Sequence, residues 1–593
     1  MSFFDFLTMA GGLALFLYGM NLLGEGLSKA SGGRLERILE KLTSSPLKAV
    51  LVGAGVTAVI QSSSAATVMV VGFVNSGIMR LEQAVGIIMG ANIGTTITSW
   101  ILGMTGIDSS SFLIRMLKPT SFSPILAIVG VAILMFSHKE ARRNTASILI
   151  GFSVLMFGMD TMSSAVDPLA EVPEFTGILT RFSQPLLGML AGLVLTAVIQ
   201  SSSASVGILQ ALCATGAVSY GAAVPIIMGQ NIGTCVTAMI SGIGASKNAR
   251  RAALIHLYFN VIGTFLFMII FYAADSAFSF DFLKDSATPF GIAAVHSIFN
   301  ITATLCLLPF SKGLVRLACL TIKDGEKQEE VSSGDRILHL LDPRFLEMPS
   351  YAVEQSRSVA AAMAGMAEEA MNISMSLLFD YDQKKAERVA ELERESDRFE
   401  DELGSYLVKL SAKDLAERDS RTLSDILHCI GDFERISDHA LNVKEAAERL
   451  YGGKLKFSGS AQDELRVMER AIHDILKISM LSFSEEDLSL ARQVEPLEEV
   501  IDGLHLEMKQ RHIERLRRGE CTVELGFILS DVLTDFERVS DHCSNIALCL
   551  LQASSNEFDT HACLRKIKDN DDFRSRVSAY RERYRLQETS VQG

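Results

Sequence analysis

Two identical clusters of polar residues interrupt long apolar stretches in the first half of this chain. One divides residues 47–76 and the other divides residues 186–216. They consist of Gln61, Ser62, Ser63 and Ser64 in the first stretch and of Gln200, Ser201, Ser202 and Ser203 in the second. Each cluster offers an amide and three hydroxyls, which both donate and accept hydrogen bonds. Helices that end at such a break also present unpaired N–H groups and positive dipole ends, so the pattern suits a multivalent anion, and its neutral oxygens suit sodium.

Two long segments in this half of the chain contain no charged side chains. Residues 83–106 and 182–246 contain no Lys, Arg, Asp or Glu. Because dehydrating a bare charge is costly, an anion bound among such residues needs co-bound cations. The electrostatics therefore predict that anion binding is coupled to a cation.

A purely structural role and a hydrolytic role fit the clusters less well than anion binding does. Serine and glutamine often bridge packed membrane helices, and for any single serine this role is the better assignment. It does not account for a four-residue cluster that recurs at an unbroken spacing inside apolar segments. A serine hydrolase would need a G-x-S-x-G elbow and a neighbouring base, and the clusters have neither. We therefore expect that the chain is not an enzyme.

The recurrence extends well beyond the clusters. Adding 139 to the residue number carries Thr57–Ala65 onto the identical segment Thr196–Ala204. The same shift carries Asn92–Thr95 onto Asn231–Thr234, and no gap is needed between the two matches. Such self-similarity at a fixed offset indicates an internal duplication.

The elements that carry the clusters are expected to be membrane helices. A spanning helix needs roughly 20 mostly apolar residues. Seven segments qualify, namely 6–28, 82–104, 123–137, 145–165, 222–245, 252–273 and 290–311. The two stretches with clusters are too long for one span, and a polar break midway suits a re-entrant hairpin packed in protein. We predict an all-α membrane domain over residues 1–320, with repeats at about 6–140 and 145–311.

Loop charges predict opposite orientations for the two copies. The loop after the first span is basic, whereas its counterpart is mostly acidic. The residues are Arg34, Arg37, Lys41 and Lys48 in the first loop and Asp167, Glu171, Glu174 and Arg181 in the second. Because basic loops stay in the cytoplasm, the copies are predicted to be inverted, with the second half of the chain on the cytoplasmic side of the inner membrane. Arg115 and Lys118 do not fit, since this scheme places their loop outside.

The second half of the chain has a different composition. Residues 1–320 hold 18 Lys and Arg against 14 Asp and Glu, whereas residues 321–593 hold 37 against 55. An acidic soluble half argues against nucleic-acid binding, which needs a basic surface. The nine cysteines form no C-x-x-C pair, which argues against a zinc knuckle or a disulfide framework. We expect a linker at 321–349, a helical domain at 350–555 and a frayed polar tail at 556–593.

Paired carboxylates mark the helical domain. Asp432–His439 recurs as Asp535–His542 with one conservative change, which indicates a second duplication. Each copy has two E-x-x-x-D pairs, namely Glu393 with Asp397 and Glu434 with Asp438, then Glu498 with Asp502 and Glu537 with Asp541. Carboxylates at i and i+4 share a helix face and repel one another without cations, so facing helices could combine them into a metal site. The alternative is a set of solvated carboxylates partly offset by Arg435 and Arg538.

The paired Q-S-S-S clusters, each followed by N-I-G-T, resemble the type II sodium/phosphate cotransporter family in its bacterial branch. The resemblance covers roughly residues 1–320 and implies that the two clusters bind the substrate. It also implies that further polar groups line substrate or sodium positions at Thr67, Asn92, Thr95, Asn231 and Thr234. Under the 139 shift Val206 corresponds to Thr67, so identical ion sites in the two copies are not expected.

The helical domain is similar to PhoU, a phosphate-signalling family built from two three-helix repeats, over most of residues 350–555. This resemblance implies that the E-x-x-x-D pairs can hold a cluster of divalent or trivalent metal ions. It also implies a regulatory role for the domain.

Three other polar features lie in the predicted spans. His256 with Asn260 and His296 with Asn300 each share a helix face at i, i+4, and we expect them to pack the bundle through hydrogen bonds. Asp160 stands where the first copy has Asn21, and both a cation ligand and an interfacial residue fit its position near a helix end.

These observations predict a sodium-coupled carrier of inorganic phosphate that works by alternating access in the inner membrane, with a PhoU-like regulatory domain. The expected partners are phosphate, membrane lipid, and either a second copy of the chain or a phosphate-signalling protein. The rival hypothesis is a membrane-anchored phosphate sensor that does not transport.

Overall fold

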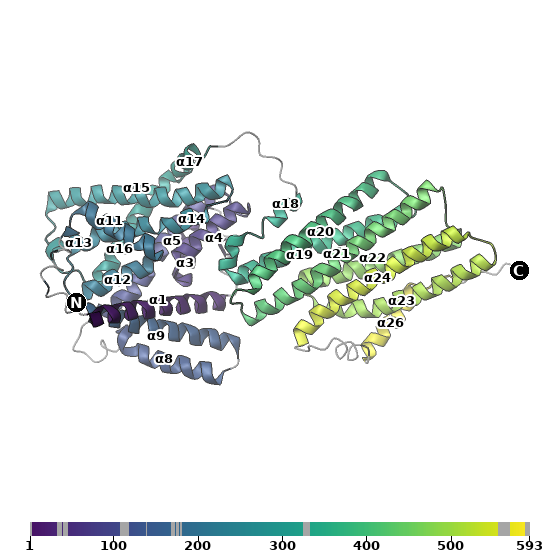
Figure 1. Cartoon of the computed structure of the whole chain (residues 1–593), viewed down its shortest axis with the longest axis horizontal. Helices are drawn as coiled ribbons and strands as arrows, with labels where there is room; N and C mark the ends of the chain where they lie inside the picture. Colours follow the sequence, from purple (N-terminus) through teal and green to yellow (C-terminus); the bar gives the residue numbers. More distant parts are fainter. Residues whose placement is uncertain are drawn as a thin grey trace. The chain divides into compact units, whose positions relative to one another are not determined.

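The chain folds into two helical units (Figure 1). The computed structural model describes residues 3–31, 38–39, 45–106, 118–137, 139–167, 172, 177, 181–323, 333–555, 568 and 570–587. Within these ranges the backbone is mostly helical, and the only β feature is an isolated bridge between Ser219 and Ser286. The units are Met1–Glu330 and Val331–Gly593, and their boundary lies inside the predicted linker. The predicted all-α fold class is confirmed.

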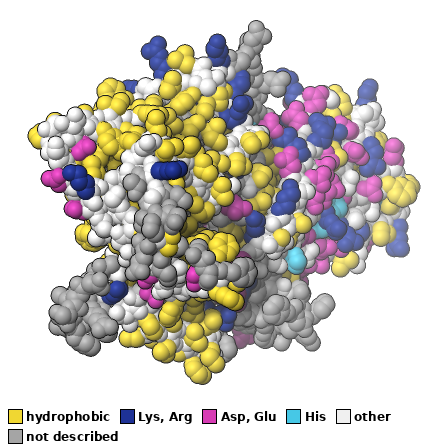
Figure 2. All heavy atoms as spheres, turned by 60° about the vertical axis from the view of Figure 1, so that its left-hand side comes forward, with side chains coloured by type: hydrophobic (Ala, Val, Ile, Leu, Met, Phe, Trp, Pro, Cys, Tyr) yellow, Lys and Arg dark blue, Asp and Glu magenta, His cyan; other side chains and the backbone are white. Residues whose placement is uncertain are grey.

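The described part of the first unit contains seven helical segments that are long and apolar enough to cross a membrane. They are α1 (Phe3–Ser31), α5 with α6 (Leu81–Gly94, Thr96–Gly103), α8 (Pro119–Phe136), α9 (Glu140–Val166), α13 with α14 (Tyr220–Gly233, Cys235–Ser241), α15 (Lys247–Phe278), and α16 with η4 and α17 (Pro289–Leu307, Leu308–Phe310, Ser311–Thr321). Each overlaps one predicted span, because a long apolar run satisfies its backbone internally only as a helix. Apolar side chains accordingly cover much of the visible surface of this unit (Figure 2).

Four shorter apolar helices flank the polar clusters. They are α3 (Pro46–Ile60), α4 (Ser63–Asn75), α11 (Pro185–Ile199) and α12 (Ser202–Ala214). At 1.5 Å per residue each is roughly 20 Å long, shorter than the roughly 30 Å hydrocarbon core of a bilayer. These lengths suit the re-entrant hairpins expected from the sequence, which stay a prediction.

The duplication is visible in the helix boundaries. Adding 139 to the bounds of α3, α4 and α5 gives the bounds of α11, α12 and α13. The packing repeats as well, because α3 packs on α5 as α11 packs on α13, and the first helices of the two copies, α1 and α9, pack on each other. Of the loop residues used to predict inversion, Arg34, Arg37, Lys41, Glu171, Glu174 and Arg115 lie outside the described residues.

Glycines let the repeated helices approach closely. A Cβ atom at Gly19 would lie 2.2 Å from Leu155 N, and one at Gly158 would lie 2.3 Å from Phe16 N, so only glycine fits where α1 meets α9. Without a hydrophobic driving force between helices in lipid, such close backbone contact is a main source of association. Helices α1 and α9 are therefore held together by tight packing.

The second unit is built from two groups of three long helices that lie side by side (Figure 1). They are α19 (Pro349–Leu377), α20 (Gln383–Ser411) and α21 (Glu417–Gly452), then α22 (Gly459–Glu485), α23 (Leu488–Arg517) and α24 (Val523–Ser555). The short elements α18 (Ser333–Leu338) and η5 (Pro343–Glu347) precede them. Helices α21 and α24 carry the duplicated motif and pack on each other, with Phe433 and Phe536 almost completely buried.

The prediction of a frayed tail is wrong for one segment. Residues Asp571–Arg583 form α26, which packs on α23. Phe573 and Val577 are buried on one face, and Tyr584 and Leu586 are buried just beyond the helix. The polar average of residues 556–593 concealed apolar residues at an i, i+4 spacing, which suffice to anchor a short amphipathic helix.

Candidate functional site

Each polar cluster reverses the chain between two short helices. Gln61 caps the C-terminus of α3 and Gln200 caps that of α11, and both glutamines have a left-handed backbone with φ near 60°. The following serine caps the next helix, because Ser62 Oγ accepts from Ala65 N and Ser201 Oγ accepts from Ala204 N. A left-handed conformation is uncommon for residues other than glycine. Its occurrence at both glutamines shows that the two copies form the same sharp reversal, which we call the first and the second tip.

The two tips meet inside the first unit. Ser63 Oγ lies 3.4 Å from Ser202 Oγ, and Ser64 Oγ donates to the carbonyl oxygen of Gln200 at 3.4 Å. Ser63, Ser202 and Ser203 are buried, whereas Gln200 is exposed. The fold thus brings together the clusters that the sequence places 139 residues apart.

The five residues expected to line substrate or sodium positions fall into three groups. Thr95 of the first copy contacts the second tip, since its Oγ1 lies 3.4 Å from Ser202 Oγ and 3.3 Å from Ser203 Oγ. Thr67 and Thr234 instead donate to carbonyls of their own segment, Ser63 O at 2.8 Å and Asn231 O at 2.6 Å.

The two asparagines reach the late membrane helices. Asn92 Nδ2 donates to Asn260 Oδ1 at 3.1 Å, and Asn231 Nδ2 donates to Asn300 Oδ1 at 2.7 Å. His296 Nε2 lies 3.3 Å from Asn231 Oδ1. Asn260, Asn300 and His296 thus make the expected bundle hydrogen bonds, and they make them to the candidate ion-site asparagines. His256 Nδ1 is buried and has no hydrogen-bond partner within the described residues. Asp160 is exposed on α9.

Sequence reasoning missed several residues that hold the tips in place. Thr98 Oγ1 donates to Gln61 Oε1 at 2.7 Å, and Ser99 Oγ lies 2.9 Å from His296 Nδ1. In the second copy Thr196 Oγ1 donates to Ser205 Oγ at 2.8 Å. The spacing of Thr98 could have revealed it, because it lies one helical turn after Thr95 and recurs under the 139 shift as Thr237.

Comparison with known proteins identifies two domains. The profile of the Na+/Pi-cotransporter family matches residues 15–164 and 157–284, and the PhoU domain profile matches residues 361–447 and 465–550. The chain thus contains a Na+/Pi-cotransporter domain followed by a PhoU domain. Each profile matches twice, in agreement with the two duplications.

Similar proteins match either nearly the whole chain or one part of it. "Putative inorganic phosphate export protein YjbB" of Escherichia coli strain K12 is 24% identical over 550 residues, which are 92% of this chain and 97% of that protein. "Sodium-dependent phosphate transport protein 2A" of Rattus norvegicus is 27% identical over 186 residues, which are 31% of this chain and 29% of that protein. The crystal structure of PhoU from Pseudomonas aeruginosa matches with a TM-score of 0.33 and 23% identity, covering 34% of this chain and 97% of that one.

Residues of the duplicated motif connect the two halves of the PhoU domain through His–Asp contacts. His439 Nδ1 lies 2.9 Å from Asp535 Oδ1, and His542 Nδ1 lies 2.8 Å from Asp432 Oδ1. Each histidine thus pairs with the aspartate of the other copy, and the two rings lie 5.7 Å apart. These symmetric pairs join α21 to α24 and so hold the two three-helix groups together.

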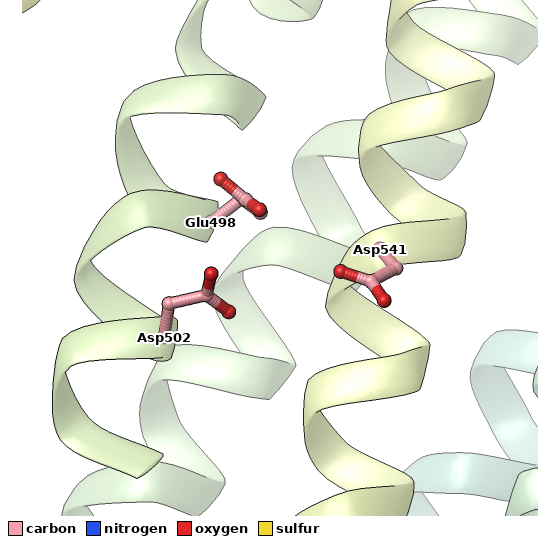
Figure 3. Close-up of side chains that lie close together, drawn as sticks. All are labelled: Glu498, Asp502 and Asp541. Atoms are coloured by element: carbon pink, nitrogen blue, oxygen red, sulfur yellow. The ribbon is translucent and has the colours of Figure 1, made fainter. Parts of the chain in front are cut away.

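Three of the predicted metal ligands gather at one point of the PhoU domain. Glu498 and Asp502 on α23 point toward Asp541 on α24 (Figure 3). One oxygen of each lies within 4.8 Å of the others. The fourth carboxylate of this copy, Glu537, lies 3.5 Å from His505 Nδ1 instead.

The first copy does not assemble in the same way. Among the described residues the carboxylates of Glu393, Asp397, Glu434 and Asp438 form no group as close as that of Glu498. Glu434 is still affected by its neighbours, because desolvation and the charge of Asp438 raise its pKa to about 7. The predicted eight-residue set is thus divided into a tight group of three and a looser remainder.

The tight group has the electrostatics of a cation site. Burial, followed by the charges of Glu495 and Asp502, raises the pKa of Glu498 to about 8. Burial and the neighbouring carboxylates also raise the pKa values of Asp502 and Asp541. Carboxylates that are desolvated together suit a hard divalent or trivalent cation. The residues present therefore fit the metal that the PhoU resemblance implies.

A lysine from outside the repeats stands beside this group. Lys568 Nζ lies 3.0 Å from Glu495 Oε1, and Ser544 Oγ donates to the other oxygen of Glu495 at 2.5 Å. Glu495 precedes Glu498 by one helical turn and is buried. The segment just before α26 therefore supplies a positive charge next to the candidate metal ligands, although its composition predicted only a frayed tail.

Proposed function

We propose that this chain couples the movement of inorganic phosphate to sodium and carries both across the cytoplasmic membrane by alternating access. The observation that supports this most directly is the meeting of two duplicated Q-S-S-S tips within a family of phosphate transporters. The word export in the name of YjbB is compatible with this proposal, because the gradients of sodium and phosphate set the direction of net movement.

The chemistry of the tips suits an oxyanion that loses its hydration shell when it binds. Hydroxyls of Ser63, Ser64, Ser202 and Ser203 replace water as donors, and the N-termini of α4 and α12 add positive dipole ends. Because no charged residue lies in 182–246, the excess negative charge of phosphate must be offset by bound cations. This requirement is our reason for coupling to sodium, and the sodium dependence in the name of the rat relative agrees with it.

Oxygen atoms near the tips supply candidate sodium ligands. Thr95 contacts two serines of the second tip, so its hydroxyl is the best placed of the five residues named from the resemblance. Within the described part of the chain, the other four residues make no hydrogen bond to a serine of the opposite tip and instead donate hydrogen bonds to other protein groups. They are Thr67, Asn92, Asn231 and Thr234. We assign them to sodium sites that rearrange when the ion enters.

The PhoU domain is proposed to regulate the carrier from the cytoplasm. Glu498, Asp502 and Asp541 would hold a divalent or trivalent metal ion, which would neutralise their mutual repulsion. A second copy of the chain or a phosphate-signalling protein is the expected partner. The rival function, a phosphate sensor without transport, predicts phosphate binding at the tips with no flux.

Radiolabelled phosphate uptake into proteoliposomes separates these functions. A sodium gradient is expected to drive uptake that a matched potassium gradient does not drive. Phosphate binding measured on the same preparation reports whether the protein is intact. Intact binding without sodium-dependent flux would contradict the carrier and favour the sensor.

A further inference from the structure

The two copies contain the same glutamine–threonine pair, but only one pair is hydrogen bonded. Thr98 Oγ1 donates to Gln61 Oε1 at 2.7 Å, and Gln61 is only 8% exposed. The 139-residue shift carries this pair onto Thr237 and Gln200. Gln200 is exposed, and the buried hydroxyl of Thr237 has no hydrogen-bond partner within the described part of the chain. A buried hydroxyl without a hydrogen-bond partner destabilises the arrangement that contains it. Thr237 lacks an acceptor equivalent to Gln61 Oε1, which accepts from Thr98.

The difference arises neither from the residue types nor from the backbone of the tips. Both glutamines have the same left-handed conformation, with φ 60° and 58°. Helix α14, which carries Thr237, contacts α11 as α6, which carries Thr98, contacts α3. The two copies therefore hold the same parts in two different arrangements.

A second pair of equivalent threonines shows the same split. Thr95 contacts Ser202 and Ser203 across the copies. Its counterpart Thr234 donates to Asn231 O, and within the described residues it makes no hydrogen bond to a serine of the first tip. At two positions, then, a threonine of the first copy contacts a tip residue and its equivalent in the second copy does not.

An inverted duplication gives this asymmetry a functional meaning. When two inverted copies exchange their arrangements, a site between them opens to the opposite side. On the basis of the proposed transport function, we propose that Thr237 is a positioning residue that donates to Gln200 in the opposite-facing state, in which Thr98 releases Gln61. Thr234 then contacts the first tip in place of Thr95. The structure described here is one of these two states.

Two mirrored substitutions in the full chain test this exchange. Thr98→Val and Thr237→Val each remove one hydroxyl, while Thr98→Ser and Thr237→Ser keep it. The protein is reconstituted in one orientation, and phosphate flux is measured from each face. The ratio of the two half-saturating phosphate concentrations is compared, because it follows the balance between the two facing states.

The valine variants are expected to move this ratio in opposite directions, each by roughly two- to tenfold, the factor that one hydrogen bond contributes. The serine variants should restore the wild-type ratio. Hydrogen exchange of the purified chain gives a second readout without flux. Thr98→Val should increase exchange around Gln61, and Thr237→Val should decrease it there by populating the state in which Thr98 holds Gln61.

The outcomes separate this proposal from the function on which it rests. Shifts of both valine variants in the same direction, or no shift in Thr237→Val, would overturn the exchange. Should Thr237→Val not yield folded protein, Thr237→Ala removes the same hydroxyl with less bulk. A wild-type chain without sodium-dependent flux would overturn the proposed function, and hydrogen exchange would still decide whether the two pairs alternate.

Discussion

Single hydroxyl groups are important at the tips because no charged side chain is available there to bind the anion. Ser202 stands at the centre of the contacts, within 3.4 Å of both Ser63 and Thr95. In an uncharged and largely buried site, the loss of one donor to an anion is not compensated by water. Ser202, which contacts two residues of the other copy, is therefore the most informative single residue for substrate binding.

Replacing Ser202 by alanine should weaken phosphate binding. We expect the half-saturating phosphate concentration for flux to rise roughly tenfold, the cost of one hydrogen bond to a charged group. The matched control is Ser76→Ala, which removes a buried hydroxyl that donates to Gly72 O within its own helix. An equal effect of both substitutions would show that Ser202 acts only on stability.

Glu498 should make the metal-free PhoU domain sensitive to pH. Its pKa is about 8 in the folded chain against an ordinary 4.5, so between these values the folded state keeps a proton that the unfolded state releases. Stability should therefore fall as the pH rises from about 5 to 8, and Mn2+, which displaces the proton, should restore it at pH 8.

Thermal unfolding of the full chain at pH 6 and pH 8, with and without Mn2+, measures this effect. Glu498→Gln should abolish the decrease of the unfolding temperature between pH 6 and pH 8. Each ~1 kcal/mol of relieved repulsion corresponds to about 2–4 °C. The same substitution should abolish the increase of the unfolding temperature that Mn2+ causes. Glu524→Gln, at an exposed position of α24, is the control. A gain from Mn2+ that persists in Glu498→Gln would refute the assignment.

At the scale of elements, α26 links the end of the chain to the candidate metal ligands. Arg581 Nη2 lies 3.4 Å from Glu499 Oε1, and Tyr584 OH donates to Asp474 Oδ2 at 2.5 Å. These contacts and the buried Phe573 fix the segment against α22 and α23, so that Lys568 can reach Glu495. The helix thus positions an internal cation beside the carboxylates.

Removing this internal cation should favour a metal ion. At pH 8 we expect Lys568→Ala to bind Mn2+ several-fold more tightly, because the carboxylates lose a competing positive charge. Equilibrium dialysis with metal analysis measures the affinity. Arg576→Ala is the matched control, since Arg576 pairs with Asp572 of its own helix. Unchanged or weaker Mn2+ binding in Lys568→Ala would contradict competition.

At the scale of the whole molecule, each unit contains its own candidate site. All contacts between the tips lie within Met1–Glu330, and the carboxylate group lies within Val331–Gly593. Each unit packs its own duplicated helices around its own site. Transport should therefore depend on the first unit, and its regulation on the second.

A chain that ends at residue 323 should keep sodium-dependent phosphate flux in proteoliposomes. It should no longer respond to Mn2+ added on the side of the PhoU domain, because the carboxylates are absent. The full chain measured in parallel provides the control. A truncated protein that elutes as a folded species but carries no phosphate would show that the PhoU domain is part of the transport machinery.

The sequence alone determined the features that local chemistry expresses. A polar cluster inside an apolar stretch is visible without a structure, and its return at Gln200 reveals the duplication. Seven apolar runs predicted seven spans, because in lipid a backbone has almost no alternative to the helix. The E-x-x-x-D spacing likewise marked Glu498 and Asp502.

Only the tertiary structure decided which of these residues meet. It brought Ser63 to Ser202, paired His439 with Asp535 across the copies, and placed Lys568 beside Glu495. It also showed that Thr98 holds Gln61 while Thr237, its equivalent, has no described partner. Such differences depend on how distant helices pack, and packing breaks the symmetry that the duplicated sequence retains.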